Sequence, residues 1–291
     1  MSYYFDTRKT LTDLKERDET NYLLDFINHA MKGFEKYGEK DIRHDYFELM
    51  HDLITNYSFN IKNFFLRAFI EYEEIRTIED LDNITEEELK GEFDPILFRY
   101  KSLKTNLERS IVVEAWSMFE FAITTIFEQL FTEEEKSSRN DEYSKSFKTI
   151  LNKNFKNVHP EQIELVVSEL ALKLDTFIPS MNKVNKIFKK YGAKYSEKEN
   201  DIEFLQFYSR LRNGIHNNFI YKGPDKKNYE FKGNVYRFQD GKSIIENVQS
   251  QFDNIELVGE LFFVIFRFFN SLRIDETILN PLPTMKELLN E

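Results

Sequence analysis

Residues that break helices are scarce in this sequence, which has 9 glycines and 6 prolines among 291 positions. The same chain carries 29 phenylalanines, and 41% of its residues are hydrophobic. A sheet-rich fold needs glycine and proline at short intervals for its turns, so this balance favours long helices packed by large side chains. We therefore expect a mostly all-α fold with enough core for one large domain or two modest ones.

The spacing of apolar residues predicts where the elements lie. Apolar positions three or four apart predict the first three helices over about 12–38, 40–56 and 60–76. Thr85 lies three residues before Glu88 in a capping-box pattern, which predicts a short acidic helix ending at Gly91. Further helices are expected over about 96–132, 143–154, 160–176, 179–192, 200–218 and 251–273, with a β-hairpin over about 229–246 and a turn at Asp240-Gly241.

These elements predict three parts of the chain. Residues 1–95 form an acidic N-terminal helical unit, residues 96–275 form a helical domain, and residues 276–291 form a C-terminal tail. The β-hairpin is then a small insertion before the last helix of the domain.

The absence of cysteine excludes disulfides and thiolate metal sites, and no signal-peptide pattern precedes the first helix. A cytoplasmic protein is expected. Two apolar stretches, 110–131 and 257–272, resemble membrane spans in their hydrophobicity, but both contain charged residues. In the first stretch the carboxylates fall in one sector of the helix, as in a buried helix with one wet edge, so no membrane association is expected.

The charge is unevenly distributed. The net charge is −11, but residues 1–144 carry −14, residues 145–236 carry +7, and residues 237–291 carry −4. The overall value argues against a protein that coats nucleic acid through bulk positive charge. The middle segment is compatible either with a phosphate-binding surface or with a solvated lysine-rich face.

Within the basic segment, the stretch "FLQFYSRLRNGIHNNFIY" (204–221) combines an apolar stripe with a polar cluster. On a helical wheel, Arg212 and His216 lie together at one edge of the stripe, with Ser209 beside them. Asn213 and Asn217 continue around the polar side. The stripe itself comprises Phe204, Phe207, Tyr208, Leu211, Ile215 and Phe219.

This combination of residues suits phosphodiester cleavage. Histidine exchanges a proton near neutral pH, and a guanidinium holds a phosphate and offsets the charge that grows in the transition state. RNA needs no metal, because the ribose 2′-hydroxyl is itself the nucleophile. A carboxylate of the 110–131 helix could orient His216. The alternative is that Gly214 ends the helix and leaves His216 in an exposed turn without a catalytic role.

The motif "LRNGIHNN" (211–218) resembles the signature of HEPN (higher eukaryotes and prokaryotes nucleotide-binding) domains. The segment "LERSIVVEAWSMFEFAITTIFEQL" resembles the first core helix of that family, and the resemblance covers about 98–275. It implies a bundle of four to five helices that dimerises, so that two Arg-His motifs face each other in one composite site. Many members are metal-independent endoribonucleases of toxin-antitoxin, abortive-infection or other antiviral defence systems.

The resemblance also implies roles for individual residues. Arg212 would hold the scissile phosphate, His216 would act on the 2′-hydroxyl or the leaving oxygen, and Asn213 would orient the site. Apart from the resemblance, the position of Arg210, Asn217, Asn218 and Ser209 around the same helix makes them possible substrate-binding residues. The family has four to six residues between its arginine and histidine, whereas Arg212 leaves three and Arg210 leaves five. Spacing therefore favours Arg210, while the Arg-Asn pair and the shared helix face favour Arg212.

The partners expected on this reading are RNA, a second copy of the chain and a regulatory or antitoxin protein; no cofactor is expected. One alternative is a non-catalytic module that binds a nucleotide or a protein through the same residues. In another, the acidic unit 1–95 masks the basic segment until a trigger arrives. His44, Glu48 and His51 share a helix face and suggest a metal, but a solvated face is the commoner meaning of such spacing, so no metal is expected.

Overall fold

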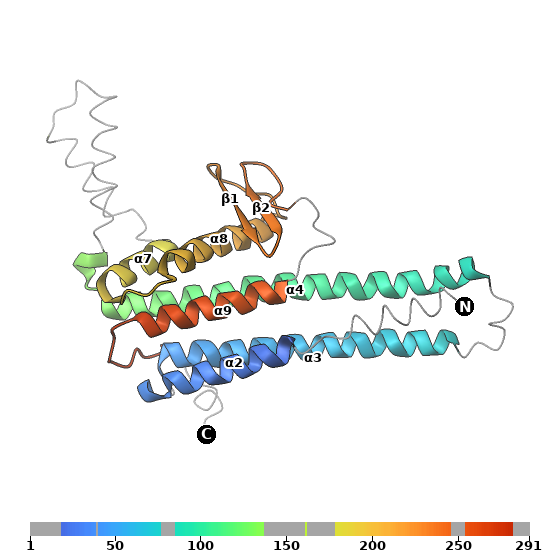
Figure 1. The fold of residues 1–291 in the computed structure, drawn as a ribbon, viewed down its shortest axis with the longest axis horizontal. Helices are drawn as coiled ribbons and strands as arrows, with labels where there is room; N and C mark the ends of the chain where they lie inside the picture. The colour runs from blue at the N-terminus through green and yellow to red at the C-terminus, as the bar shows by residue number, and fades with distance from the viewer. Residues whose placement is uncertain are drawn as a thin grey trace.

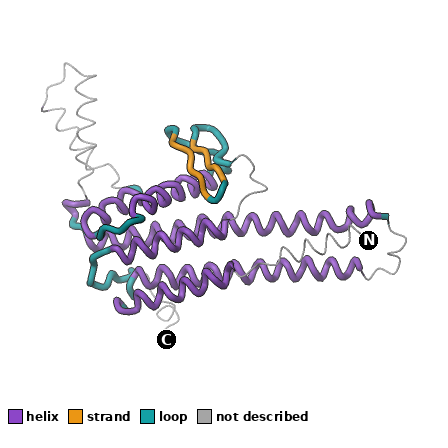
Figure 2. Tube along the Cα trace, in the orientation of Figure 1, coloured by secondary structure: helices purple, strands orange, loops and turns teal. Residues whose placement is uncertain are grey.

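The computed structural model describes residues 19–38, 40–76, 85–136, 161, 178–245 and 254–281 (Figures 1 and 2). The prediction of a mostly α-helical chain is confirmed. Apart from residue 161, the helices expected over 143–154 and 160–176 lie outside the described residues. The elements are α2 (Glu19–Phe34), the short 3-10 helix η1 (Glu35–Tyr37), α3 (Ile42–Arg76), α4 (Glu86–Leu130), α7 (Ser180–Tyr191), α8 (Lys198–His216), β1 (Lys226–Phe231), β2 (Asn234–Phe238) and α9 (Asn254–Ser271).

The helices form three layers (Figure 1). Helices α4 and α9 occupy the middle layer, with α7 and α8 packed on one side and α2 and α3 on the other. Helices α3 and α4 continue as a pair beyond the other elements. The acidic helices α2 and α3 thus lie on the side of α4 and α9 away from α8, so in this arrangement they do not mask the α8 segment.

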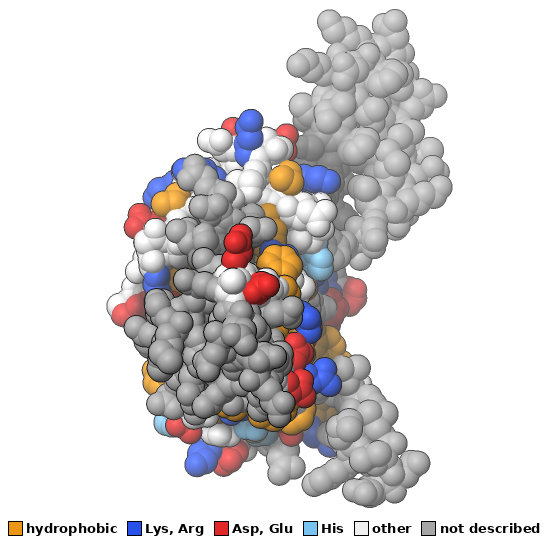
Figure 3. Space-filling view, turned by 90° about the vertical axis from the view of Figure 1, so that its right-hand side faces the viewer, with side chains coloured by type: hydrophobic (Ala, Val, Ile, Leu, Met, Phe, Trp, Pro, Cys, Tyr) orange, Lys and Arg blue, Asp and Glu red, His pale blue; other side chains and the backbone are white. Residues whose placement is uncertain are grey.

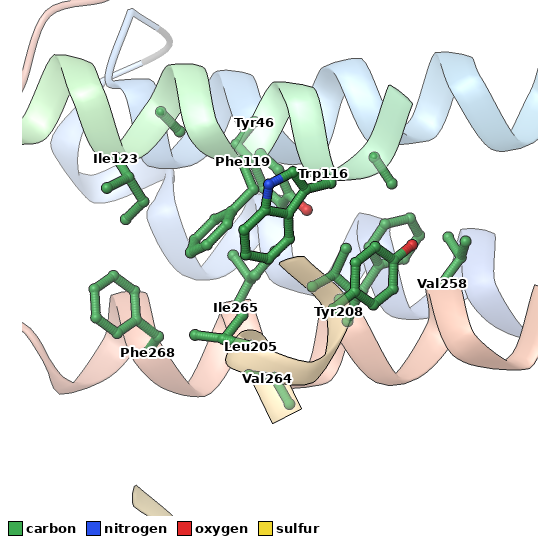
Figure 4. Close-up of a cluster of buried hydrophobic side chains, with 14 of the residues drawn as sticks. Tyr46, Trp116, Phe119, Ile123, Leu205, Tyr208, Val258, Val264, Ile265 and Phe268 are labelled. Atoms are coloured by element: carbon green, nitrogen blue, oxygen red, sulfur yellow. The ribbon is translucent and has the colours of Figure 1, made fainter. Parts of the chain in front are cut away.

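Aromatic side chains join the layers. In Figure 4, Trp116 and Phe119 of α4 meet Tyr46 of α3, Tyr208 of α8 and Phe268 of α9. The Trp116 and Tyr208 rings are stacked with their centroids 5.7 Å apart, and both side chains are buried. Burial of rings of this size contributes much of the stability of a core, which explains why the chain is rich in phenylalanine and tyrosine.

The core continues into the N-terminal helices. Phe34 of α2 and Phe47 of α3 contact Phe266 and Phe269 of α9, with ring centroids 5.9 to 6.3 Å apart. The boundary expected near residue 95 falls inside α4. A truncated chain beginning near residue 96 would expose the α9 rings to water, so functional tests need the full chain.

Two predicted helix breaks are wrong. Helix α3 continues through residues 56–60, because Tyr57 is buried and continues the apolar stripe from Ile54 to Ile61 across the expected gap. Helix α4 starts at the predicted capping box, in which the Thr85 hydroxyl accepts a hydrogen bond from the Glu88 N–H and the Glu88 carboxylate accepts one from the Thr85 N–H. It then continues through Gly91 and Pro95. Pro95 removes one backbone donor, but packing against α3 outweighs the loss of one hydrogen bond in a helix of 45 residues.

The β-hairpin before the last helix is confirmed, but its turn differs from the prediction. Strands β1 and β2 are antiparallel and join at Lys232-Gly233, where both residues have positive φ angles of 48° and 80°. The Asp240-Gly241 turn instead follows β2 and returns the chain to Ile244, whose N–H donates to the Phe219 carbonyl. The hairpin packs on α8, where the Tyr229 and Phe207 rings stack at 4.1 Å.

The segment after α9 packs on the start of α3 through a buried ion pair. Arg43 donates to both carboxylate oxygens of Asp41 at 2.8 Å, and neither side chain is exposed. The Arg43 guanidinium also donates to the carbonyls of Ile274 and Glu276, and the Ile278 N–H donates to Asp41. The first residues of the expected C-terminal tail are therefore part of the packed structure.

One described helix is long and apolar enough to cross a membrane by length and composition alone. It lies within Asp94–Leu130 of α4, and 56% of its apolar window is buried inside the fold. This burial is the pattern of a core helix of a packed protein.

Candidate functional site

The polar motif lies at the end of α8, which runs unbroken through Gly214 to His216. The sequence alternative in which the helix ends at Gly214 is therefore wrong. A Cβ at position 214 would lie 1.8 Å from Ile244 Cδ1, so any larger residue would force the buried Ile244 side chain to move, because the segment after β2 packs directly on the helix. The predicted apolar stripe is confirmed: Phe204, Phe207, Tyr208, Leu211 and Phe219 are buried, and Ile215 is half-buried.

Replacing Gly214 with alanine should lower the free energy of unfolding by about 1–3 kcal/mol, because the new methyl group overlaps Ile244. In an Ile244→Ala background the same substitution should be neutral or stabilising, since the overlap is gone and alanine favours a helix by about 1 kcal/mol over glycine. Urea unfolding of the four proteins measures both effects. An equal loss in the two backgrounds would contradict the packing explanation.

The side chain of Arg212 extends from α8 toward α4. Its Nη1 donates to Asn213 Oδ1 at 3.1 Å, and its Nη2 lies 3.6 Å from Glu120 Oε2. Its Nε is buried and has no hydrogen-bond partner among the described residues, while a quarter of the side chain is exposed. The guanidinium is thus held in position and retains donor capacity that its protein partners do not use.

Glu120 of α4 is the centre of the contacts around Arg212. Its other oxygen, Oε1, accepts a hydrogen bond from the Ser180 hydroxyl at the start of α7, at 2.7 Å. Lys183, one turn further along α7, donates to the Thr124 hydroxyl at 3.0 Å. Burial lowers the pKa of Lys183, although Glu128 and Glu120 act in the opposite direction. A carboxylate of the 110–131 stretch thus lies near the motif, as the sequence suggested, but this carboxylate, Glu120, pairs with Arg212 and not with His216.

His216 is the last residue of α8 and is exposed. No described residue forms a hydrogen bond or an ion pair with its imidazole. One turn separates it from Arg212, a spacing that brings Cβ atoms to about 5–6 Å. The imidazole is therefore available to a ligand or to a second subunit on the edge of α8 that carries Arg212.

The asparagines of the motif differ in their roles. Asn217 caps the helix, since its N–H and its Nδ2 both bond to the Asn213 carbonyl. Asn218 and Phe219 follow with positive φ angles of 54° and 62°, which turn the chain away from the helix axis. Asn213 and Asn218 are exposed, and Ser209 is half-buried on the preceding turn.

Arg210 is directed toward the β-hairpin. Its guanidinium lies 5.7 Å from the centroid of the Phe238 ring, and its Nη2 bonds to Gln206 at 3.4 Å. The structure thus brings Arg212 to the edge that carries His216 and gives Arg210 a different set of neighbours. Spacing along the sequence had favoured Arg210, whereas helix geometry favours Arg212.

Arg109 of α4 is a cation near the motif that sequence reasoning missed. Its guanidinium lies 4.9 Å from the centroid of Phe219, the residue that completes the turn after His216. Its Nε is buried without a hydrogen-bond partner among the described residues. No local pattern in the sequence links Arg109 to Phe219, a residue 110 positions away.

Figure 3 shows one face of the protein, on which the acidic and basic side chains drawn in colour are interspersed. At the end of α8, the described cations that could attract a polyanion include Arg109 and Arg212.

No known protein family, curated protein or solved structure matches this chain. The resemblance to HEPN domains consequently rests on the motif at the end of α8 and on the long helix α4.

Proposed function

We propose that this protein is a metal-independent endoribonuclease of HEPN type, acting as a homodimer in the cytoplasm, in bacterial antiphage defence or a toxin system. The proposal is carried by one observation: the unbroken helix α8 holds Arg212 and His216 one turn apart on one edge. Arg212 is fixed by Glu120 and Asn213, and His216 is exposed beside it.

The proposed reaction uses groups that this edge contains. His216 removes the proton of the ribose 2′-hydroxyl, whose oxygen attacks the adjacent phosphorus. The bond from phosphorus to the 5′-oxygen breaks, and the leaving oxygen takes a proton. The products are a 2′,3′-cyclic phosphate and a 5′-hydroxyl end. Arg212 holds the phosphate and offsets the charge that develops on its oxygens, and Asn213 orients Arg212.

A second subunit supplies the second imidazole that the reaction needs. The reaction needs a base for the 2′-hydroxyl and an acid for the leaving oxygen, and each motif contains one histidine. Two α8 ends facing each other provide two imidazoles and two guanidiniums around one phosphate. A regulatory or antitoxin protein that covers this edge would keep the enzyme inactive.

The proposal is tested by incubating the purified full chain with total RNA and with tRNA in EDTA. We expect fragments that carry 2′,3′-cyclic phosphate and 5′-hydroxyl ends, and light scattering should give the mass of a dimer. Cleavage that requires an added metal ion, or fragments with 5′-phosphate ends, would contradict the mechanism. If the RNA remained uncleaved, a non-catalytic binding function, described next, would be favoured.

The second candidate is a non-catalytic module that binds a nucleotide or a protein. The ion pair with Glu120 favours it, because this carboxylate partly neutralises the cation that should serve the phosphate. Arg212→Lys separates the two functions, since lysine keeps the charge but cannot make a two-point contact. A catalytic Arg212 predicts that cleavage is largely lost in this variant. Retained nucleotide binding, with no cleavage by either protein, would support the binding module.

A further inference from the structure

Three side chains with metal-ligating atoms meet at the start of α3. His44, Asp45 and Glu48 each bring one such atom, and these atoms all lie within 4.8 Å of one another. Their positions i, i+1 and i+4 fall within a sector of about 100° of the helix. The group lies in the layer away from α8, so it is independent of the proposed nuclease site.

The buried Nδ1 atom of His44 lacks a hydrogen-bond partner in this group. The residue is only 8% exposed, and its buried Nδ1 has no hydrogen-bond partner among the described residues. Asp45 Oδ1 lies 3.8 Å away, which is too far for a hydrogen bond. A buried ring nitrogen without a partner is unfavourable, and an ion between His44 and Asp45 would satisfy it.

Asp45 supplies a buried carboxyl group beside His44. Its side chain is 11% exposed and accepts a hydrogen bond from the Asn280 side chain. A buried carboxylate gains from a cation at close range. The Asn280 bond also fixes the orientation of the carboxylate, as partners of metal ligands commonly do.

The distances suit a small divalent ion. Two ligand atoms each about 2.1 Å from one ion stand about 3–4.2 Å apart, depending on the angle between them. The 3.8 Å between His44 Nδ1 and Asp45 Oδ1 falls in this range. Glu48 is exposed, so its side chain can turn toward the ion and water can complete the coordination.

We infer that His44, Asp45 and Glu48 bind a divalent transition-metal ion such as Zn²⁺. One imidazole and two carboxylates suit this class better than Ca²⁺ or Mg²⁺, which prefer oxygen ligands alone. The ion would join the first turns of α3 to the C-terminal segment through Asn280. From the sequence we had paired His44 and Glu48 with His51, but His51 is not in the group and its Nδ1 lies near Asp52 instead.

The test uses the full chain without an affinity tag, freed of metal by a chelator and then titrated with Zn²⁺ by calorimetry and with Co²⁺ by visible absorption. We expect one ion per chain. Glu48→Gln, a change of an exposed side chain, should weaken binding by about tenfold or more. His51→Ala is the matched control on the same helix face and should bind like the parent. The absence of saturable binding, unchanged affinity in Glu48→Gln, or an equal loss in His51→Ala would overturn the assignment.

Thermal unfolding gives a second readout. Zn²⁺ at about one hundred times its dissociation constant should raise the Tm of the parent by about 5 °C. The Glu48→Gln protein, with binding weakened about tenfold or more, should show about half of this shift or less at the same concentration. A shift of equal size in both proteins would place the ion elsewhere. No RNA is involved in either assay, so the result is separate from that of the nuclease test.

Discussion

Replacing His216 with alanine should lower the rate of RNA cleavage by a factor of about 10²–10⁴, the usual contribution of a general acid or base. The imidazole is exposed and unpaired with any described residue, so its removal should leave the fold and the free energy of unfolding almost unchanged. The measurement is the initial rate of cleavage of a labelled RNA in EDTA, for parent and variant at equal protein concentration.

His51→Ala provides the control for this comparison, because it removes another partly exposed histidine far along the chain from α8. Circular dichroism and light scattering should show the same fold and the same mass for all three proteins. If His216→Ala cleaved RNA as fast as the parent, or if His51→Ala lost activity to the same extent, His216 would not be the catalytic base.

Replacing Asp41 with asparagine should lower the free energy of unfolding by about 3–5 kcal/mol, the usual effect of breaking a buried ion pair on one side. Arg43 would keep its charge but lose the only ion-pair partner that it has among the described residues, and both side chains are fully buried. Asparagine also loses an acceptor oxygen, so the bonds from Arg43 and from the Ile278 N–H could not all be kept. The measurement is urea unfolding followed by circular dichroism.

Asp52→Asn is the control for the ion pair. It removes an exposed carboxylate from α3, the helix that follows Asp41, and its effect should stay within about 0.5 kcal/mol. A loss below about 1 kcal/mol for Asp41→Asn would show that the junction between α3 and the C-terminal segment contributes little to stability.

The spacing of apolar residues predicted helix bounds well for helices whose buried residues form one continuous stripe. Helix α7 ends before Gly192, and α8 and α9 agree with the sequence to within three residues. The stripe on α8 could be found because every residue that defines it belongs to one short segment. A local pattern of this kind can be recognised without knowing the tertiary contacts.

The predicted breaks failed where packing outweighed local preference. Gly91 and Pro95 are ordinary stop signals, but the paired helices α3 and α4 support each other across this region. The hairpin turn was misplaced for a related reason. Lys232-Gly233 and Asp240-Gly241 both suit a turn, and only the pairing of Phe231 with Asn234 decides between them.

The candidate site could be predicted only in part. Arg212 and His216 were found because their spacing places them on one helix edge. Glu120 and Ser180 lie 92 and 32 residues before Arg212 in the sequence, and no local pattern links them to it. Contacts of this kind depend on how α4, α7 and α8 pack together, which a single sequence does not reveal.

The most direct measurement of the proposed chemistry compares two RNA oligonucleotides in EDTA. One is all-ribose, and the other carries a single 2′-deoxynucleotide on the 5′ side of the bond that the protein cleaves. Attack by the 2′-hydroxyl predicts cleavage at that bond in the first oligonucleotide and none there in the second. Equal cleavage of both would contradict the mechanism, because the nucleophile would then have to come from water or from the protein.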